Sequence, residues 1–268
     1  MLKDITLGQF FPGRSPIHRL DPRTKLLMLV LYIVLLFVAS NWISYGVMAA
    51  FLLVTVKIST IPFKSIVRGL KPVVFILVFT GILNLFFTKG GRVLVSFWGL
   101  SITTVGLERA LFMMTRILML ITGTFLLTYT TSPISLTDGL ESLMKPLKKI
   151  RVPVHELAMM MCIALRFIPT LIEETDKIMS AQKARGADFE TGSLIQRAKA
   201  LVPILVPLFI SAFRRADELA TAMECRCYQG DVGRTKMKLL RYTRLDLLAF
   251  LAAACLTAAM TVLKIYGL

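Results

Sequence analysis

Long segments without charged side chains constrain this chain more than any other feature. Residues 26–56 contain no Asp, Glu, Lys or Arg and are broken only by the polar stretch at Ser40–Trp42. A helix needs about 20 apolar residues to cross the roughly 30 Å hydrocarbon core of a bilayer. The run therefore predicts two short, closely paired membrane helices. Because Arg23 and Lys25 precede the pair and Lys57 follows it, both outer ends are expected on the cytoplasmic side.

Three further apolar runs, 72–87, 110–129 and 246–265, predict three more membrane helices, with an external loop near 89–92. Arg116 lies inside the second of them and must be buried against protein or reach the interface. In lipid, such runs can satisfy their backbone groups only as helices or closed barrels. Because strand-length alternation is absent, the predicted fold class is all-α, a polytopic helical membrane protein.

Charge and hydropathy are both extreme. The 268 residues are 56% apolar with a mean hydropathy of +0.71, yet the formal net charge is +16, which argues against a soluble globular domain. Residues 132–244 hold 18 of the 32 Lys and Arg residues, which predicts a large cytoplasmic region because short basic loops are retained there. The expected organisation is membrane helices in 1–131, a cytoplasmic helical region in 132–244 and a last transmembrane helix in 245–268.

Signatures of catalysis are missing. His155-Glu156 is not followed by a second histidine at position 159, and no G-x-x-x-x-G-K-[ST] phosphate-binding loop occurs. Cys225 and Cys227 lack two further nearby ligands for a metal site. We therefore expect no enzyme activity, no metal and no cofactor. A polar lead precedes the first apolar run, so no cleavable signal peptide is expected.

The first candidate motif is Asp21-Pro22-Arg23-Thr24-Lys25, at the point where the chain enters the membrane. Asp21 can cap a helix, Pro22 suits the first helical position, and Arg23 with Lys25 mark the cytoplasmic side. A helix start with a basic anchor would account for this motif without any further function.

A second candidate is an amphipathic helix that follows Ser135. Leucine, methionine and isoleucine recur at helical intervals from Leu136 to Ile150, with lysines on other faces. The helix could lie on the membrane surface or dock a partner, and Pro146 is expected to kink or shorten it.

Two longer helices should follow, and each should end in an arginine between small residues: Ala184-Arg185-Gly186 and Cys225-Arg226-Cys227. Gly186 can adopt the left-handed conformation that ends a helix. A cation is favoured at a helix C-terminus. Each guanidinium could pair with a carboxylate or carbonyl groups of another protein, although a solvated positive terminus would also explain it.

Together, the Asp21–Lys25 motif, Ala181-Gln182-Lys183-Ala184-Arg185-Gly186 and the segment from Arg215-Ala216-Asp217 to Cys225-Arg226-Cys227 resemble the energy-coupling factor transporter transmembrane subunit. The resemblance covers nearly the whole chain. Cys-Arg-Cys departs from the Ala-Arg-Gly, or a close variant, that is common in this family.

The resemblance implies a non-catalytic scaffold subunit of an importer for vitamins or micronutrients. Its partners would be two cytoplasmic ATP-binding ATPase subunits and a substrate-binding membrane S component. Residues 132–244 would be a coupling domain in the cytoplasm of a multi-pass cell-membrane protein, with Arg185 and Arg226 each inserted into one ATPase. The implied partner-binding residues are Ala184, Arg185, Gly186, Cys225, Arg226 and Cys227.

Two other classes remain possible from the residues alone. A stand-alone secondary transporter or channel would need polar groups at mid-membrane, for which Arg116 and Asn84 are the main candidates. A nucleic-acid binder would fit the charge of +16, but interleaved aromatic residues are lacking, so no nucleic-acid partner is expected.

Overall fold

A computed structural model describes residues 10–88, 90, 92–97, 100–189, 193–230 and 239–266. These residues form two compact units. The bundle unit holds the described residues up to Gly139 together with those from Leu240 onward, and the two-helix unit lies within Leu140–Leu239. The chain therefore leaves the bundle unit at Gly139 and returns to it at Leu240.

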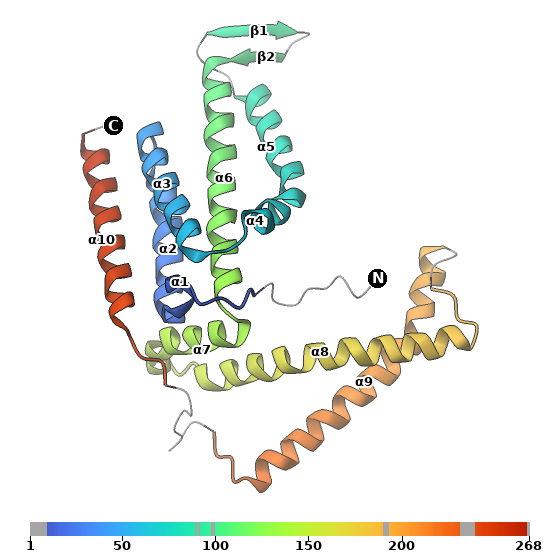
Figure 1. Cartoon of the computed structure of the whole chain (residues 1–268). Helices are drawn as coiled ribbons and strands as arrows, with labels where there is room; N and C mark the ends of the chain where they lie inside the picture. The colour runs from blue at the N-terminus through green and yellow to red at the C-terminus, as the bar shows by residue number, and fades with distance from the viewer. Residues whose placement is uncertain are drawn as a thin grey trace. The chain divides into compact units, whose positions relative to one another are not determined.

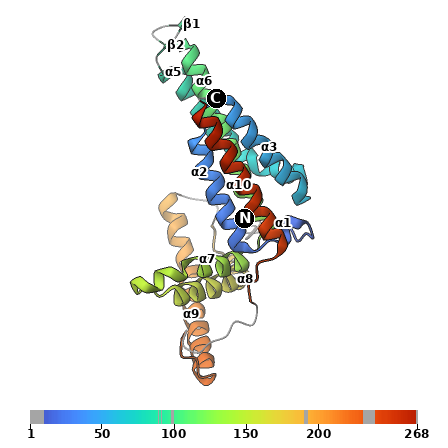
Figure 2. The same ribbon diagram turned by 90° about the vertical axis from the view of Figure 1, so that its left-hand side faces the viewer.

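The bundle unit is helical, as Figures 1 and 2 show. Its elements are α1 (Pro16–Arg19), α2 (Pro22–Val38), α3 (Trp42–Ser59), α4 (Phe63–Leu70), the short 3-10 helix η2 (Lys71–Val73), α5 (Val74–Phe87), β1 (Val93–Phe97), β2 (Leu100–Thr103), α6 (Thr104–Thr130) and α10 (Arg244–Ile265). The helix α7 (Pro133–Met144) begins in this unit and ends in the other.

The core of the bundle unit lies between four of these helices. Tyr32 and Leu36 of α2, Met48 of α3, Met119 of α6 and Met260 of α10 pack together there. A second, smaller cluster joins Ile61, Ile66 and Tyr129 near the end of α6. Because α10 shares the first cluster, the last described helix completes a core that begins with α2.

The helices confirm the all-α fold class. Residues 26–56 form the two helices α2 and α3, which are separated at the predicted break, and the run at 246–265 forms α10. Five helices are long and apolar enough to cross a membrane: α3, the joined α4 and α5, α6, α8 (Val154–Ala184) and α10. The 17-residue α2 is shorter than these five.

One connection differs from the expected loop. The short antiparallel hairpin β1–β2 joins α5 to α6. The helix α6 also begins before the predicted Ala110, because Thr103 at the end of β2 caps it: the Thr103 hydroxyl accepts a hydrogen bond from the Gly106 N–H at 3.1 Å.

The two-helix unit is built from α8 and α9 (Leu194–Cys225), preceded by the end of α7 and the 3-10 helix η3 (Lys145–Ile150). The predicted amphipathic α-helix ends at Met144, because Pro146 cannot continue the α-helical hydrogen bonds and a 3-10 turn follows. In contrast, α8 and α9 run through Pro169, Pro203 and Pro207 as single helices.

Candidate functional site

The end of α8 forms a Schellman motif around Arg185. The Gly186 N–H donates to the Lys183 carbonyl and the Ala187 N–H donates to the Gln182 carbonyl, both at 3.0 Å. Gly186 has a φ of 88°, in the left-handed region that this motif requires. Arg185 is thus the C-cap residue of the helix, and its side chain is exposed.

The end of α9 repeats this geometry around Arg226. The Cys227 N–H donates to the Glu224 carbonyl at 2.8 Å and the Tyr228 N–H donates to the Met223 carbonyl at 3.1 Å. Cys227 has a φ of 54°, so it takes the position that Gly186 takes in α8. The departure from glycine therefore leaves the helix end unchanged. Arg226 is exposed, as are Cys225 and Cys227.

The two helices cross and are joined by an ion pair. Arg215 Nη2 of α9 lies 2.7 Å from Glu174 Oε2 of α8. Arg185 follows Glu174 by eleven residues, and Arg226 follows Arg215 by eleven residues. At 1.5 Å per residue, each arginine lies about 16 Å along its own helix from the crossing. The C-terminal ends of α8 and α9 point away from each other (Figure 1), so the unit presents two separate tips of equal reach.

The start of α8 is held to the end of α7 by a buried pair. His155 Nδ1 lies 3.1 Å from Glu141 Oε1, and both side chains are buried. His155 therefore has a packing role in the two-helix unit. Among the described residues, no group of three His, Cys, Asp or Glu side chains could hold a metal ion.

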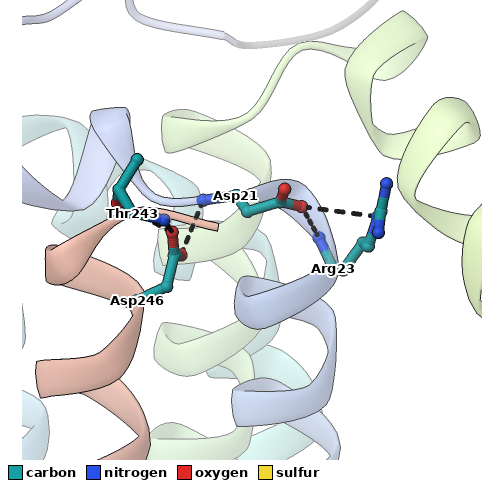
Figure 3. Close-up of polar contacts among 4 residues, drawn as sticks. All are labelled: Asp21, Arg23, Thr243 and Asp246. Carbon is teal, nitrogen blue, oxygen red and sulfur yellow. Dashed lines mark hydrogen bonds and ion pairs between the residues drawn. The ribbon is translucent and has the colours of Figure 1, made fainter. Parts of the chain in front are cut away.

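The Asp21 motif forms the predicted helix start (Figure 3). The Asp21 carboxylate accepts a hydrogen bond from the Arg23 N–H at 2.9 Å, and Pro22 is the first helical residue. Arg23 Nε lies 3.8 Å from Asp21 Oδ1, and its guanidinium lies over the Tyr242 ring, 5.5 Å from the centroid. The motif thus contacts the segment that returns from the two-helix unit.

Asp246 connects this motif to α10, a contact that sequence reasoning missed. Its Oδ1 accepts from the Asp21 N–H at 2.9 Å, and its Oδ2 accepts from the Thr243 N–H and the Thr243 hydroxyl at 2.7 and 2.8 Å (Figure 3). Asp246 is 1% exposed. One buried carboxylate therefore caps α10 and fixes the start of α2. The Thr-x-x-Asp pattern at 243–246 was the available sequence signal.

Lys25, one of the two predicted basic anchor residues, is buried in the bundle unit. Its ammonium is buried and donates to the Thr130 carbonyl at 2.9 Å, the Thr131 hydroxyl at 3.2 Å and the His18 carbonyl at 3.3 Å. A cation is stabilised at the carbonyl end of a helix, here α6. Burial lowers the pKa of His18 below 6.5, an effect that its contact with the Phe11 carbonyl opposes and the charge of Lys25 strengthens.

The chain leaves the bundle unit at Gly139 and returns to it at Leu240, and residues next to both points contact the start of α2. At the exit, a Cβ added to Gly139 would lie 2.9 Å from Pro22 Cβ, so a side chain there would force the backbone apart. At the return, Tyr242 covers Arg23 and Thr243 bonds Asp246. The Asp21 motif is therefore a junction at which the exit and the return of the chain are both held.

Arg116 is bonded to protein groups inside the bundle unit. Of the two alternatives expected for it, the structure shows burial against protein. Its Nε donates to the Tyr45 hydroxyl at 2.7 Å and its Nη2 to the Ala39 carbonyl at 3.4 Å. The guanidinium also lies 5.4 Å from the centroid of the Phe37 ring. These contacts join α2, α3 and α6 and give Arg116 a structural role.

Comparison with known proteins gives one consistent result. Residues 13–239 match the model of the CbiQ family, described as cobalt transport protein. The chain is 58% identical over 255 residues to the energy-coupling factor transporter transmembrane protein EcfT of Thermosediminibacter oceani, covering 95% of this chain and 96% of that protein. It is 54% identical to EcfT of Clostridium kluyveri, with 99% of each chain covered. With EcfT of Bacillus subtilis it shares 46% identity, over 98% of this chain and all of the relative.

Proposed function

Because the chain belongs to the CbiQ family and is a transmembrane component of an energy-coupling factor transporter, we propose that it couples two ATPases to substrate uptake. It would join two cytoplasmic ATP-binding subunits to a membrane S component that binds the vitamin or micronutrient. The chain itself would hydrolyse no ATP and bind no substrate. The two-helix unit would lie in the cytoplasm and the bundle unit in the cell membrane.

The observation that supports this proposal is the equivalence of the two arginine tips. Arg185 and Arg226 end their helices in the same Schellman geometry, are exposed, and follow the crossing by the same number of residues. Two equal tips suit two similar partners. A guanidinium at a helix end offers a fork of donors to a carboxylate or to carbonyl groups in a partner's groove.

The junction at Asp21 suggests how motion would reach the membrane. The chain passes between the two units at Gly139 and Leu240, and residues next to both crossings contact the start of α2. A displacement of the arginine tips by nucleotide-driven movement of the ATPases would therefore act on α2 and α10. From these helices it would pass to a bound S component.

The test is to replace both tips, Arg185→Ala and Arg226→Ala, in the complete transporter. Truncating a buried, hydrogen-bonded charge at an interface costs about 2 to 5 kcal/mol. We therefore expect the double variant to lose co-purification of the ATPases, and with it ATP-driven uptake. The purified chain should keep its thermal unfolding temperature, because neither side chain is buried within it.

The matched control replaces two exposed basic residues on the same helices, Lys177→Ala of α8 and Arg214→Ala of α9. This control removes the same charge without touching the tips, and it should retain both ATPases. If the two double variants lost the ATPases equally, overall charge would be responsible and the proposed role of the tips would be wrong.

The stand-alone transporter has less support. It requires polar groups that converge on a path through the membrane. The main candidate, Arg116, is bonded to Tyr45 and Ala39. Uptake by the purified chain in vesicles without ATPases would instead support a stand-alone transporter.

A further inference from the structure

A half-open cavity of about 430 Å³ lies between helices of the bundle unit. Its lining comes from α1, α2, α3, α6 and α10 and is almost entirely apolar, with Leu20, Met28, Leu126 and Leu248 among its residues. Its lining residues come from the first turns of α2 and α10 and from the last turns of α3 and α6. The proposed function makes no use of this space.

Tyr32 lines the cavity and carries a buried hydroxyl. Its side chain is only 5% exposed, and its hydroxyl has no hydrogen-bond partner among the described residues. Buried tyrosine hydroxyls normally find a partner, and an exception calls for an explanation such as an absent ligand. Lys25 also lines the cavity, but its ammonium is already bonded to three oxygen atoms.

Cationic side chains surround this end of the bundle unit. Arg19 ends α1, Lys57 lies in the last turn of α3 and Arg244 begins α10, and all three are exposed. The carboxylates of Asp21 and Asp246, at the starts of α2 and α10, are buried and occupied by N–H donors. Because these two carboxylates accept hydrogen bonds from N–H groups, the three exposed cations can attract an anion.

We propose that this cavity binds one acyl chain of an anionic glycerophospholipid. The phosphate would lie against Arg19, Lys57 and Arg244. The Tyr32 hydroxyl, which is enclosed by protein in the free chain, would turn toward the cavity and donate to an ester carbonyl. Tyr32 follows Lys25 by seven residues, about 10 Å along α2, which suits a group at the border between interface and hydrocarbon. Basic pockets between transmembrane helices on the cytoplasmic side bind anionic headgroups in this way.

The size of the cavity favours an acyl chain over a peptide. If a methylene group takes about the volume of a water molecule, roughly 30 Å³, the cavity holds on the order of 14 methylene groups. A helix is about 10 Å wide and rises 5.4 Å per turn, so the same volume would hold about one turn. This lipid site is independent of the proposed coupling function.

The test is native mass spectrometry of the purified full chain with added phosphatidylglycerol or phosphatidylcholine. We expect one tightly retained phosphatidylglycerol per chain and at least tenfold weaker retention of phosphatidylcholine. Ala249→Phe, which fills the cavity from α10, should abolish retention, whereas Ala254→Phe on the same helix, outside the lining, should not. Equal retention by both alanine variants would overturn the proposal.

Two further variants keep the proposal testable if Ala249→Phe does not fold. Tyr32→Phe removes the hydroxyl alone and should weaken retention about fivefold, the effect of one neutral hydrogen bond. The triple change Arg19→Gln, Lys57→Gln and Arg244→Gln should abolish the preference for phosphatidylglycerol. Unchanged retention in Tyr32→Phe together with unchanged preference in the triple variant would show ordinary surface lipid and reject the site. Oleate, tested alone, distinguishes a free fatty acid from a phospholipid, and tighter binding of oleate would refute the phospholipid.

Discussion

At the scale of single residues, Cys227 determines whether the second arginine is presented like the first. A residue other than glycine in the left-handed region costs about 1 to 2 kcal/mol. Cys227 nevertheless holds a φ of 54° and gives α9 the same end as α8. A cysteine has a small, unbranched side chain, and Cys227 is exposed, so no neighbour clashes with it.

Two substitutions at this position should have opposite effects. Cys227→Gly relieves the backbone strain and should keep ATPase binding, with unfolding stability unchanged or raised by up to about 1 kcal/mol. Cys227→Val puts a β-branched side chain at positive φ and should weaken ATPase binding. Thermal unfolding of the chain and co-purification of the ATPases measure both effects. Normal binding by Cys227→Val would show that the Schellman end is dispensable.

Asp246 is the residue whose loss should most disturb the bundle unit. Asp246→Ala leaves the buried N–H of Asp21 and the partly buried N–H of Thr243 without their acceptor and removes the cap of α10. We expect a loss of roughly 2 to 4 kcal/mol in unfolding free energy. Thermal unfolding in detergent measures it, with Glu108→Ala, an exposed carboxylate at the start of α6, as the control. A loss as small as that of the control would contradict the capping role.

At the scale of elements, features set by local sequence could be predicted and contacts between distant segments could not. The helix break at Ser40–Trp42, the stop at Pro146 and both arginine helix ends follow from nearby residues. The bond between Asp21 and Asp246 joins residues 225 positions apart, and no periodicity encodes it. The cavity depends on the packing of five helices, so it could not be predicted from the sequence either.

The hairpin β1–β2 was missed for a different reason. Its strands span only five and four residues, too few for an alternation of apolar and polar residues to stand out. The burial of Lys25 was missed because a lysine before an apolar run is the usual mark of the cytoplasmic side. Three oxygen acceptors, the Thr130 carbonyl at the end of α6 among them, explain why this ammonium lies inside.

The crossing of α8 and α9 supports a prediction at this scale. Glu174 and Arg215 should show a coupling energy of about 0.5 to 1 kcal/mol in a double-mutant cycle, because the pair is partly exposed and screened by solvent. Exchanging the charges, Glu174→Arg with Arg215→Glu, should restore the stability and coupled ATP hydrolysis that either single exchange reduces. Additive effects of the two exchanges would mean that the pair does not hold the crossing.

At the scale of the whole molecule, the distribution of charge predicts on which side of the membrane each connection lies. Residues 132–244 are predicted to be cytoplasmic and the connection around the hairpin external. This assignment would account for the net charge of +16, because charged side chains require water. It would also account for the exposed arginine tips, because the proposed ATPases lie on the same side.

Labelling with a membrane-impermeant maleimide tests this topology. In a chain expressed without the ATPases, Cys225 and Cys227 are exposed and form no disulfide, so they should react in inside-out vesicles and not in sealed cells. A single Arg92→Cys next to the hairpin, with the native cysteines replaced by serine, should react with the opposite preference. Labelling of all sites from one side would refute the predicted arrangement.

The shared core of α2 and α10 also sets an order of events during synthesis. The ribosome makes α2 early and α10 last among the described helices, with the whole two-helix unit in between. Until α10 emerges, the Asp21 N–H lacks its acceptor and one wall of the cavity is absent. The core between α2 and α10 therefore stays incomplete until nearly the whole chain has been synthesised. During this time, membrane chaperones or proteases would encounter the incomplete bundle unit.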